Sequence, residues 1–180
     1  AISNAARHPS LQYCATIYHG IPVEKYPFRA KASDYLLFLG RIHHDKGTYE
    51  AIQLAQKVKV PLVIAGIIQD QNYFEKYVEP FIDGKSVSYI GPVGPGTKEK
   101  VLGGARALLH LINCHEAFGL TVVEAMACGT PVIAIRRGSM SELIIDGKTG
   151  FLVDDLAEAV NKFQKLPHIS RRHCREWVKK

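Results

Sequence analysis

The sequence predicts an α/β domain: a Rossmann-like, doubly wound parallel sheet of about six strands with helices on both faces. Short runs rich in Leu, Val and Ile alternate with stretches that have helical periodicity. The runs are apolar at nearly every position, as in strands that crossover helices bury on both faces. Ligands of such sheets bind beyond the carboxyl ends of the strands, so the residues after each run are candidate site residues.

Six apolar runs are expected to form the strands. The first ends at Gly40 and the second at Gly66, and a glycine permits a tight turn out of the sheet. The expected strands cover residues 35–39, 61–66, 86–90, 107–112, 130–135 and 151–153.

Helical stretches connect these runs. Pro80 stops the second helix because proline cannot continue one, and Thr97 is a candidate N-cap for the third. Ser139 is placed to cap a short helix that ends at Gly147. The expected helices cover residues 49–55, 70–79, 97–103, a stretch from near Gly119 that carries Glu124, 139–147 and 155–165.

Residues 1–33 lack this alternation, so we expect them to lie outside the domain of residues 34–180. Their pattern allows a helix over residues 1–12, belonging to a preceding unit, and a strand over residues 14–18. The stretch that follows, through residue 33, is expected to be mostly a loop linker.

The composition fits one domain with one core. The chain has 180 residues, of which 47% are hydrophobic and 22% charged, as in ordinary globular domains. No apolar run reaches the roughly 18–20 residues that cross a bilayer, and the first residues do not resemble a secretory signal. The four cysteines lack CxxC spacing and are expected to be reduced, which favours a cytoplasmic protein.

The net charge of +6 favours phosphorylated substrates or anionic surfaces. A basic cluster near the C-terminal end has two interpretations: a solvated helix face, or a peripheral contact with the inner face of a membrane. Aromatic residues do not interleave with it, so no nucleic-acid partner is expected. The cluster comprises Lys162, Lys165, Arg171, Arg172, Arg175, Lys179 and Lys180.

The segment from Glu116 to Glu124 is the most informative in the chain. If a helix begins near Gly119, Glu116 lies in the loop before it and Glu124 lies inside it. The unpaired N–H groups of that helix start attract phosphate or another anion, and the two carboxylates can accept hydrogen bonds from sugar hydroxyls. This combination predicts a nucleotide-sugar site.

A basic loop, Gly40 to Gly47, follows the first strand. Its Arg41 and Lys46 are well placed for a diphosphate. Such a loop alone is most often only solvated, but this one falls at the same edge of the predicted sheet as Glu116. We therefore expect the loop to bind phosphate.

Three sets of residues carry a resemblance to a known family: Gly40-Arg41 with Lys46-Gly47, Glu116 to Val132, and Ser141 to Gly150. Their order is similar to that of the retaining glycosyltransferases of family four, the glycosyl transferases group 1, over about residues 13–165. This family includes sucrose synthases, bacterial mannosyltransferases and glycogen synthase relatives. The chain looks like their C-terminal, donor-binding domain, which is one half of the two-domain GT-B fold.

The resemblance implies roles for the motif residues. Arg41 and Lys46 would hold the donor diphosphate and stabilise the leaving group, with Glu116 at the sugar hydroxyls. Glu124 would accept hydrogen bonds from the ribose. The remaining contacts would be backbone ones: the N–H groups of Phe118, Gly119 and Leu120 to the sugar and phosphate, and Pro92 and Val93 around the base.

The resemblance also implies a UDP- or GDP-sugar as substrate and no cofactor, because basic side chains and helix N-termini replace a metal. No histidine has the spacing of a structural zinc site, neither His43 and His44 nor His110 with Cys114 and His115.

Two segments depart from the family pattern. Asn113 to His115 replaces a serine-containing segment, and Arg136 to Ser139 replaces a glycine-rich turn. Arg136 and Arg137 have two interpretations, recognition of an acidic sugar or extra phosphate, and a surface role. Glu142 fits either local structure or the site.

The family's acceptor site belongs to an N-terminal domain, of which residues 1–12 resemble only the last element, and residues 173–178 resemble the start of final helices. We therefore expect the donor-binding half of a longer enzyme, which binds donor weakly and transfers little alone. A non-catalytic nucleotide-binding module and a sugar-nucleotide epimerase are the alternatives. A glycoside hydrolase using Glu116 and Glu124 is disfavoured by the basic loop.

Overall fold

The computed structural model describes residues 1–180 and contains one parallel sheet of six strands in the order β3-β2-β1-β4-β5-β6. This is the strand order of a doubly wound Rossmann-type sheet. Each predicted strand is confirmed within about two residues at either end. The strands are β1 (Leu36–Leu39), β2 (Leu62–Ala65), β3 (Val87–Tyr89), β4 (Ala107–His110), β5 (Val132–Ile135) and β6 (Gly150–Val153).

The α-helices are α1 (Thr48–Val58), α2 (Gln71–Tyr77), α3 (Thr97–Gly104), α4 (Leu120–Ala127), α5 (Met140–Leu143), α6 (Leu156–Phe163) and α7 (Arg171–Val178). Four 3-10 turns complete the chain: η1 (Val23–Lys25), η2 (His44–Lys46), η3 (Glu79–Phe81) and η4 (Leu166–His168).

Three details of the predicted helices were wrong, and the first is the end of α1, which runs to Val58 and not to residue 55. Helix α3 begins at Thr97, so Gly96, and not Thr97, is its N-cap, and the Gly96 backbone N–H donates to Oε2 of Glu99 at 2.5 Å. Ser139 precedes α5 but makes no side-chain cap, and α5 ends at Leu143, well before Gly147. The Ser139 hydroxyl instead donates to the carbonyl of Phe118, in the loop before α4.

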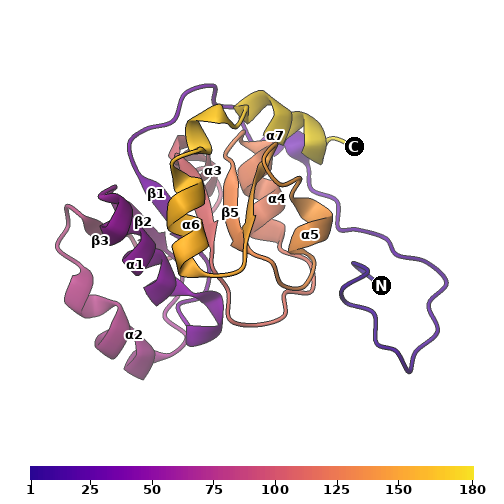
Figure 1. Ribbon diagram of the computed structural model, residues 1–180, viewed down its shortest axis with the longest axis horizontal. Coiled ribbons are helices and arrows are strands. Elements are labelled where there is room, and N and C mark those ends of the chain that lie inside the picture. Colours follow the sequence, from indigo (N-terminus) through magenta and orange to yellow (C-terminus); the bar gives the residue numbers. More distant parts are fainter.

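Helices cover both faces of the sheet (Figure 1). Helices α1 and α6 pack together on one face, and α3, α4 and α7 pack on the other. The strand residues between them are almost wholly buried, and one core of 41 residues runs through the domain. This explains why the strand sequences are continuously apolar.

The first residues form an open loop beside the helices and the sheet (Figure 1). The predictions of a helix over residues 1–12 and a strand over residues 14–18 are therefore wrong. The physical reason is exposure: Leu11 and Ile17 keep 61% and 74% of their surface in contact with solvent. A helix or strand with no apolar face buried has little to stabilise it.

Glu142 holds this N-terminal loop to the domain. Its carboxylate accepts the N–H groups of Asn4 and Ala5, both at 2.8 Å, and the hydroxyl of Tyr18 at 2.9 Å. Partial burial acts to raise the pKa of Glu142, but these hydrogen bonds outweigh it and the pKa is lowered. Of the two interpretations of Glu142, the structure therefore shows the one in local structure.

Two members of the C-terminal basic cluster are engaged in the fold. The Arg171 guanidinium donates to three backbone carbonyls and one hydroxyl, and Arg175 donates to the carbonyls of Val23, Tyr26 and Ala127. These bonds fasten the linker before β1 to helix α7. No helix in the structure has the length and apolar character that crossing a membrane requires.

We predict that Arg171→Met lowers the free energy of unfolding by about 2–4 kcal/mol, because it leaves several buried carbonyls without their charged donor. The bonds lost include those to Gly103 at 2.6 Å and Ala105 at 2.9 Å. Arg172→Met is the matched control, since Arg172 is exposed on the same helix and should change stability by less than about 0.5 kcal/mol. Urea denaturation of both variants measures the difference, and equal effects would contradict the assigned role.

Candidate functional site

Strands β1 and β4 are neighbours that separate before they end. Strand β1 pairs with β2 over all four of its residues, but with β4 only at Leu36–Ala107 and Leu37–Leu108. The chain winds outward in both directions from this pair of strands, which makes it the topological switch point where such sheets bind ligands.

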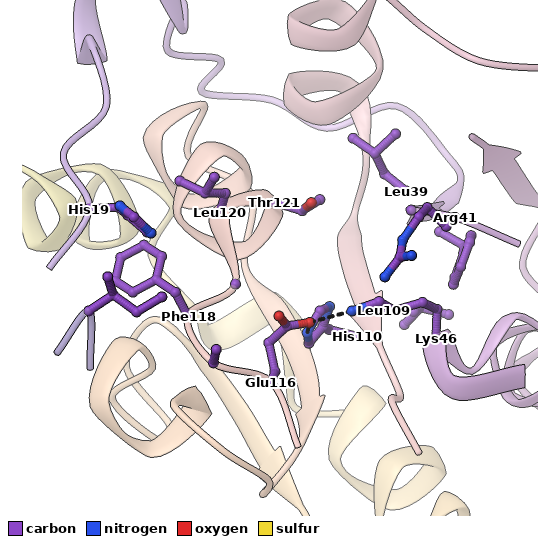
Figure 2. Close-up of a pocket in the computed structure, with 15 residues that line it drawn as sticks. His19, Leu39, Arg41, Lys46, Leu109, His110, Glu116, Phe118, Leu120 and Thr121 are labelled. Atoms are coloured by element: carbon purple, nitrogen blue, oxygen red, sulfur yellow. Dashed lines mark hydrogen bonds and ion pairs between the residues drawn. The ribbon is translucent and has the colours of Figure 1, made fainter. Parts of the chain in front are cut away.

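A cavity of about 390 Å³ lies where the two strands part. Its walls include the unpaired ends of β1 and β4 and the loops that follow them (Figure 2). The lining residues are Ile2, His19, Phe38, Leu39, Gly40, Arg41, Lys46, Leu109, His110, Glu116, Ala117, Phe118, Gly119, Leu120 and Thr121.

This cavity brings together six of the nine predicted site residues: Arg41, Lys46, Glu116, Phe118, Gly119 and Leu120. The other three do not line it. Glu124 lies further along α4, and Pro92 and Val93 lie in the loop between β3 and α3. Their predicted contacts with a ligand stay predictions.

Lys46 and Glu116 form an ion pair inside the cavity. Lys46 Nζ donates to Glu116 Oε2 at 2.7 Å, and each side chain is 19% exposed (Figure 2). A hydrogen bond between charged groups in such a half-enclosed place contributes about 1.5–3 kcal/mol. The pair joins the loop after β1 to the loop after β4, so it spans the opening between the two strands.

Arg41 stands at the edge of the cavity. One of its N–H groups donates to Gln69 Oε1 at 2.8 Å, which ties the loop after β1 to the loop after β2. A guanidinium has five N–H donors, so several remain for an anion.

The start of α4 presents backbone donors to the cavity. Gly119 has φ of +100° and provides no side-chain cap. The N–H groups of Phe118, Gly119, Leu120 and Thr121 donate to no group in the protein. An uncapped helix start next to Lys46 and Arg41 makes this end of the cavity suited to an anion.

The turn Arg137–Ser139 supports the loop that carries Glu116. Ser139 N donates to the Glu116 carbonyl at 3.0 Å, and the Ser139 hydroxyl donates to the carbonyl of Phe118. Gly138 has φ of +57°, and a Cβ there would collide with the Glu116 carbonyl oxygen. This close approach explains why a glycine stands between Arg137 and Ser139.

Neither Arg137 of this turn nor the preceding Arg136 lines the cavity. Arg136 pairs with exposed Asp154 at 3.3 Å, and Arg137 donates to the Ile112 carbonyl at 3.2 Å. The structure thus shows local roles for both side chains.

Glu124 has two partners that the sequence analysis missed. Its Oε1 accepts from Lys98 Nζ and from the Tyr26 hydroxyl, both at 2.7 Å, and the side chain is 13% exposed. Burial acts to lower the pKa of Lys98, but Glu124 outweighs it and the pKa is raised. A role for Lys98 could have been predicted from the sequence, because it lies in the first turn of the predicted helix after the third strand. Nothing in the linker sequence singles out Tyr26.

His19 and His110 also line the cavity, and the sequence analysis gave neither a role in the site. The His19 ring meets Phe118 edge-on with centroids 5.0 Å apart. His110, the last residue of β4, is nearly buried, and its Nε2 lies 3.7 Å from Glu116 Oε2. Burial lowers the pKa of His110, so its ring is neutral at pH 7.

One group of potential metal ligands lies in the turn after β1: His43, His44 and Asp45, with ligand atoms within 4.8 Å of one another. His43 Nδ1 already accepts the Asp45 N–H at 3.2 Å, and Asp45 contacts both imidazoles. These contacts give the three side chains a structural role in shaping the turn that ends at Lys46.

Comparison with known proteins identifies the family. The family described as "Glycosyl transferases group 1" matches residues 24–180. The chain belongs to this family. It is 28% identical over 181 aligned residues to the glycogen synthase of Mycobacterium tuberculosis, covering 93% of this chain and 44% of that protein. The chain therefore spans less than half the length of this curated relative.

Solved structures of glycosyltransferases share the fold. AviGT4, a glycosyltransferase involved in avilamycin A biosynthesis, superposes with a TM-score of 0.82 and 26% identity, covering 98% of this chain and 56% of that one. HepE of Anabaena in complex with UDP and glucose superposes with a TM-score of 0.76 and 20% identity, covering 92% and 51%. These likenesses confirm the Rossmann-like α/β fold expected for one half of a GT-B glycosyltransferase.

The contribution of the close contact between Gly138 and Glu116 to stability can be tested. We predict that Gly138→Ala lowers the free energy of unfolding by about 2–5 kcal/mol, because a left-handed residue is strained and the new methyl group meets the Glu116 carbonyl. Gly147→Ala is the control: its φ is +73° but the added methyl would meet nothing within 4 Å, so it should cost only about 1–2 kcal/mol. Thermal denaturation of both variants measures the two losses of stability. Equal losses would contradict the prediction, because they would show that the added methyl group at residue 138 is accommodated without cost.

Proposed function

We propose that this chain is the donor-binding half of a retaining glycosyltransferase, which transfers a hexose from a UDP- or GDP-sugar to an acceptor. The observation that carries the proposal is the cavity between β1 and β4, where Arg41, Lys46 and Glu116 meet the uncapped start of α4. The family membership and the UDP seen in the structural relative HepE support it.

The basic end of the cavity suits the donor diphosphate. Lys46 and Arg41 from the loop after β1, and the residues at the start of α4, line one cavity. When the bond to the sugar breaks, negative charge grows on the departing diphosphate, and groups fixed in advance around it stabilise the transition state. We therefore propose that donor binding needs no divalent metal.

Glu116 suits the sugar. Its carboxylate is held inside the cavity by Lys46, and its loop is fixed by Gly138 and Ser139. An ionised carboxylate accepts hydrogen bonds from two hydroxyls of a hexose at once. The volume of about 390 Å³ lies within the range of sites for small ligands, about 300–1,000 Å³.

Glu124 suits the ribose. Lys98 and Tyr26 both bind its Oε1, so Oε2 remains available for the ribose hydroxyls. The two donors also fix the rotamer of the carboxylate before the ligand arrives, which lowers the entropic cost of binding. Pro92 and Val93, at the same edge of the sheet, are proposed to contact the base.

A second, acceptor-binding domain is proposed to complete the enzyme. The chain covers less than half of the glycogen synthase it matches, so catalysis is proposed only for the longer protein, with slow or no transfer by residues 1–180.

A cytoplasmic location is also proposed. All four cysteines are free thiols and Cys14 is exposed, which supports a reducing compartment. A peripheral membrane contact remains a proposal that the exposed Arg172, Lys179 and Lys180 would serve.

Calorimetric titration with UDP, GDP, ADP, UDP-glucose and GDP-mannose, in EDTA, tests the proposal. We expect one nucleotide and its sugar to bind, and Arg41→Ala or Glu124→Ala to weaken this binding about tenfold or more, since each removes a charged hydrogen bond. Arg136→Ala is the matched control, because Arg136 pairs with Asp154 outside the cavity, and it should bind as the parent chain does.

Unchanged affinity in both the Arg41 and Glu124 variants, with the fold intact, would contradict the site. A chain that binds no nucleotide at all would contradict the function. Incubation of the longer enzyme with donor alone separates the alternatives: an epimerase converts donor without acceptor, a transferase needs the acceptor, and a binding module does neither.

A further inference from the structure

His110 carries a buried polar atom that the fold leaves without a partner. The residue ends β4, where it pairs with Ala134 of β5, and its side chain is 11% exposed and lines the cavity. Nε2 is fully buried and makes no hydrogen bond. Leaving such an atom unpaired is costly, and native structures do so rarely and usually with a functional reason.

Glu116 Oε2 lies 3.7 Å from this atom, which is too far for a hydrogen bond. That same oxygen is occupied by Lys46 at 2.7 Å. Figure 2 shows the three side chains converging, with the imidazole of His110 beside the contact between the Glu116 carboxylate and the Lys46 ammonium. The arrangement therefore offers the carboxylate oxygen two partners, only one of which is engaged.

We propose that His110 is the positioning residue for Glu116: its Nε2–H takes over the carboxylate when Lys46 turns to the diphosphate of the donor. This inference rests on the proposed function and adds to it a residue and a sequence of contacts. The unpaired Nε2 of His110 is the donor for the second contact of that exchange.

The movement required is small. A hydrogen bond of about 2.9 Å would form if Oε2 approached the ring by about 0.8 Å from its present 3.7 Å. The loop itself need not shift, because Gly138 and Ser139 fix its backbone. We propose that a rotation of the Glu116 side chain makes this approach.

A neutral imidazole suits this task. The charged groups that act on the His110 ring are Lys46 from η2 and Glu116 from the loop before α4. Burial and Lys46 hold the ring neutral, so His110 offers an N–H without adding a cation that would compete for the diphosphate. Once Lys46 has left, this N–H donates to the partly buried carboxylate and keeps it oriented.

Two variants separate positioning from packing. His110→Gln keeps an N–H near the position of Nε2, whereas His110→Leu fills a similar volume without one. Each variant, with the parent chain, is titrated with the pairs UDP and UDP-glucose, and GDP and GDP-mannose. In parallel, the ring nitrogens of His110 are followed by NMR in the parent chain while UDP or GDP is added.

The expected results are specific to the exchange. The Leu variant should bind both the nucleoside diphosphate and its sugar nucleotide about tenfold more weakly than the parent chain, since Glu116 loses its second partner when Lys46 turns to the diphosphate. The Gln variant should restore most of that loss. His110→Leu should be no less stable to urea, because no hydrogen bond is removed. The NMR spectrum should show a neutral ring with its proton on Nε2, whose signal moves when the nucleotide binds.

The outcomes that overturn the inference differ from those that overturn the function. Nucleotide binding by the parent chain, with an unmoved Nε2 signal or a ring protonated on Nδ1, overturns the exchange and leaves the donor site in place. The exchange is likewise overturned if the Leu and Gln variants lose sugar-nucleotide affinity equally. Absence of any nucleotide binding by the parent chain overturns both.

Discussion

The separation of β1 from β4 is the constraint on which the site depends. These two strands share only two pairs of residues, and beyond them the sheet opens between Phe38–Leu39 and Leu109–His110. Because the chain winds outward from this point in both directions, no helix covers the opening, and the loops after both strands converge on it. Lys46 from the loop after β1 and Glu116 from the loop after β4 therefore meet at this opening.

The two carboxylates predicted to bind the donor, Glu116 and Glu124, are held in the same way, each by a lysine at 2.7 Å and in a partly buried place. Lys46 serves Glu116, and Lys98 with Tyr26 serves Glu124. Pairing of this kind fixes the rotamers of both carboxylates before a ligand arrives. The difference between them is that Glu116 also faces a second, unengaged donor, whereas Glu124 already has both of its donors.

The sequence was sufficient for the sheet, because continuous burial leaves a plain apolar signature, and for the convergence of Arg41 with Glu116, because strand ends share an edge. It was insufficient where one residue depends on distant partners. His110 is a single polar residue in an apolar run, and only the structure shows that its Nε2 is unpaired beside Glu116. The N-terminal loop is held by Glu142, a contact between segments more than 130 residues apart that no periodicity reveals.

A crystal structure of the chain with UDP or GDP tests the central claim most directly, namely that the β1–β4 opening binds the diphosphate in exchange for the Lys46–Glu116 contact. The account predicts a phosphate oxygen within about 3 Å of Lys46 Nζ and of an N–H at the start of α4, with Glu116 Oε2 moved into hydrogen-bond distance of His110. A nucleotide bound elsewhere, or one bound while Lys46 and Glu116 remain 2.7 Å apart and away from the phosphate, would contradict it.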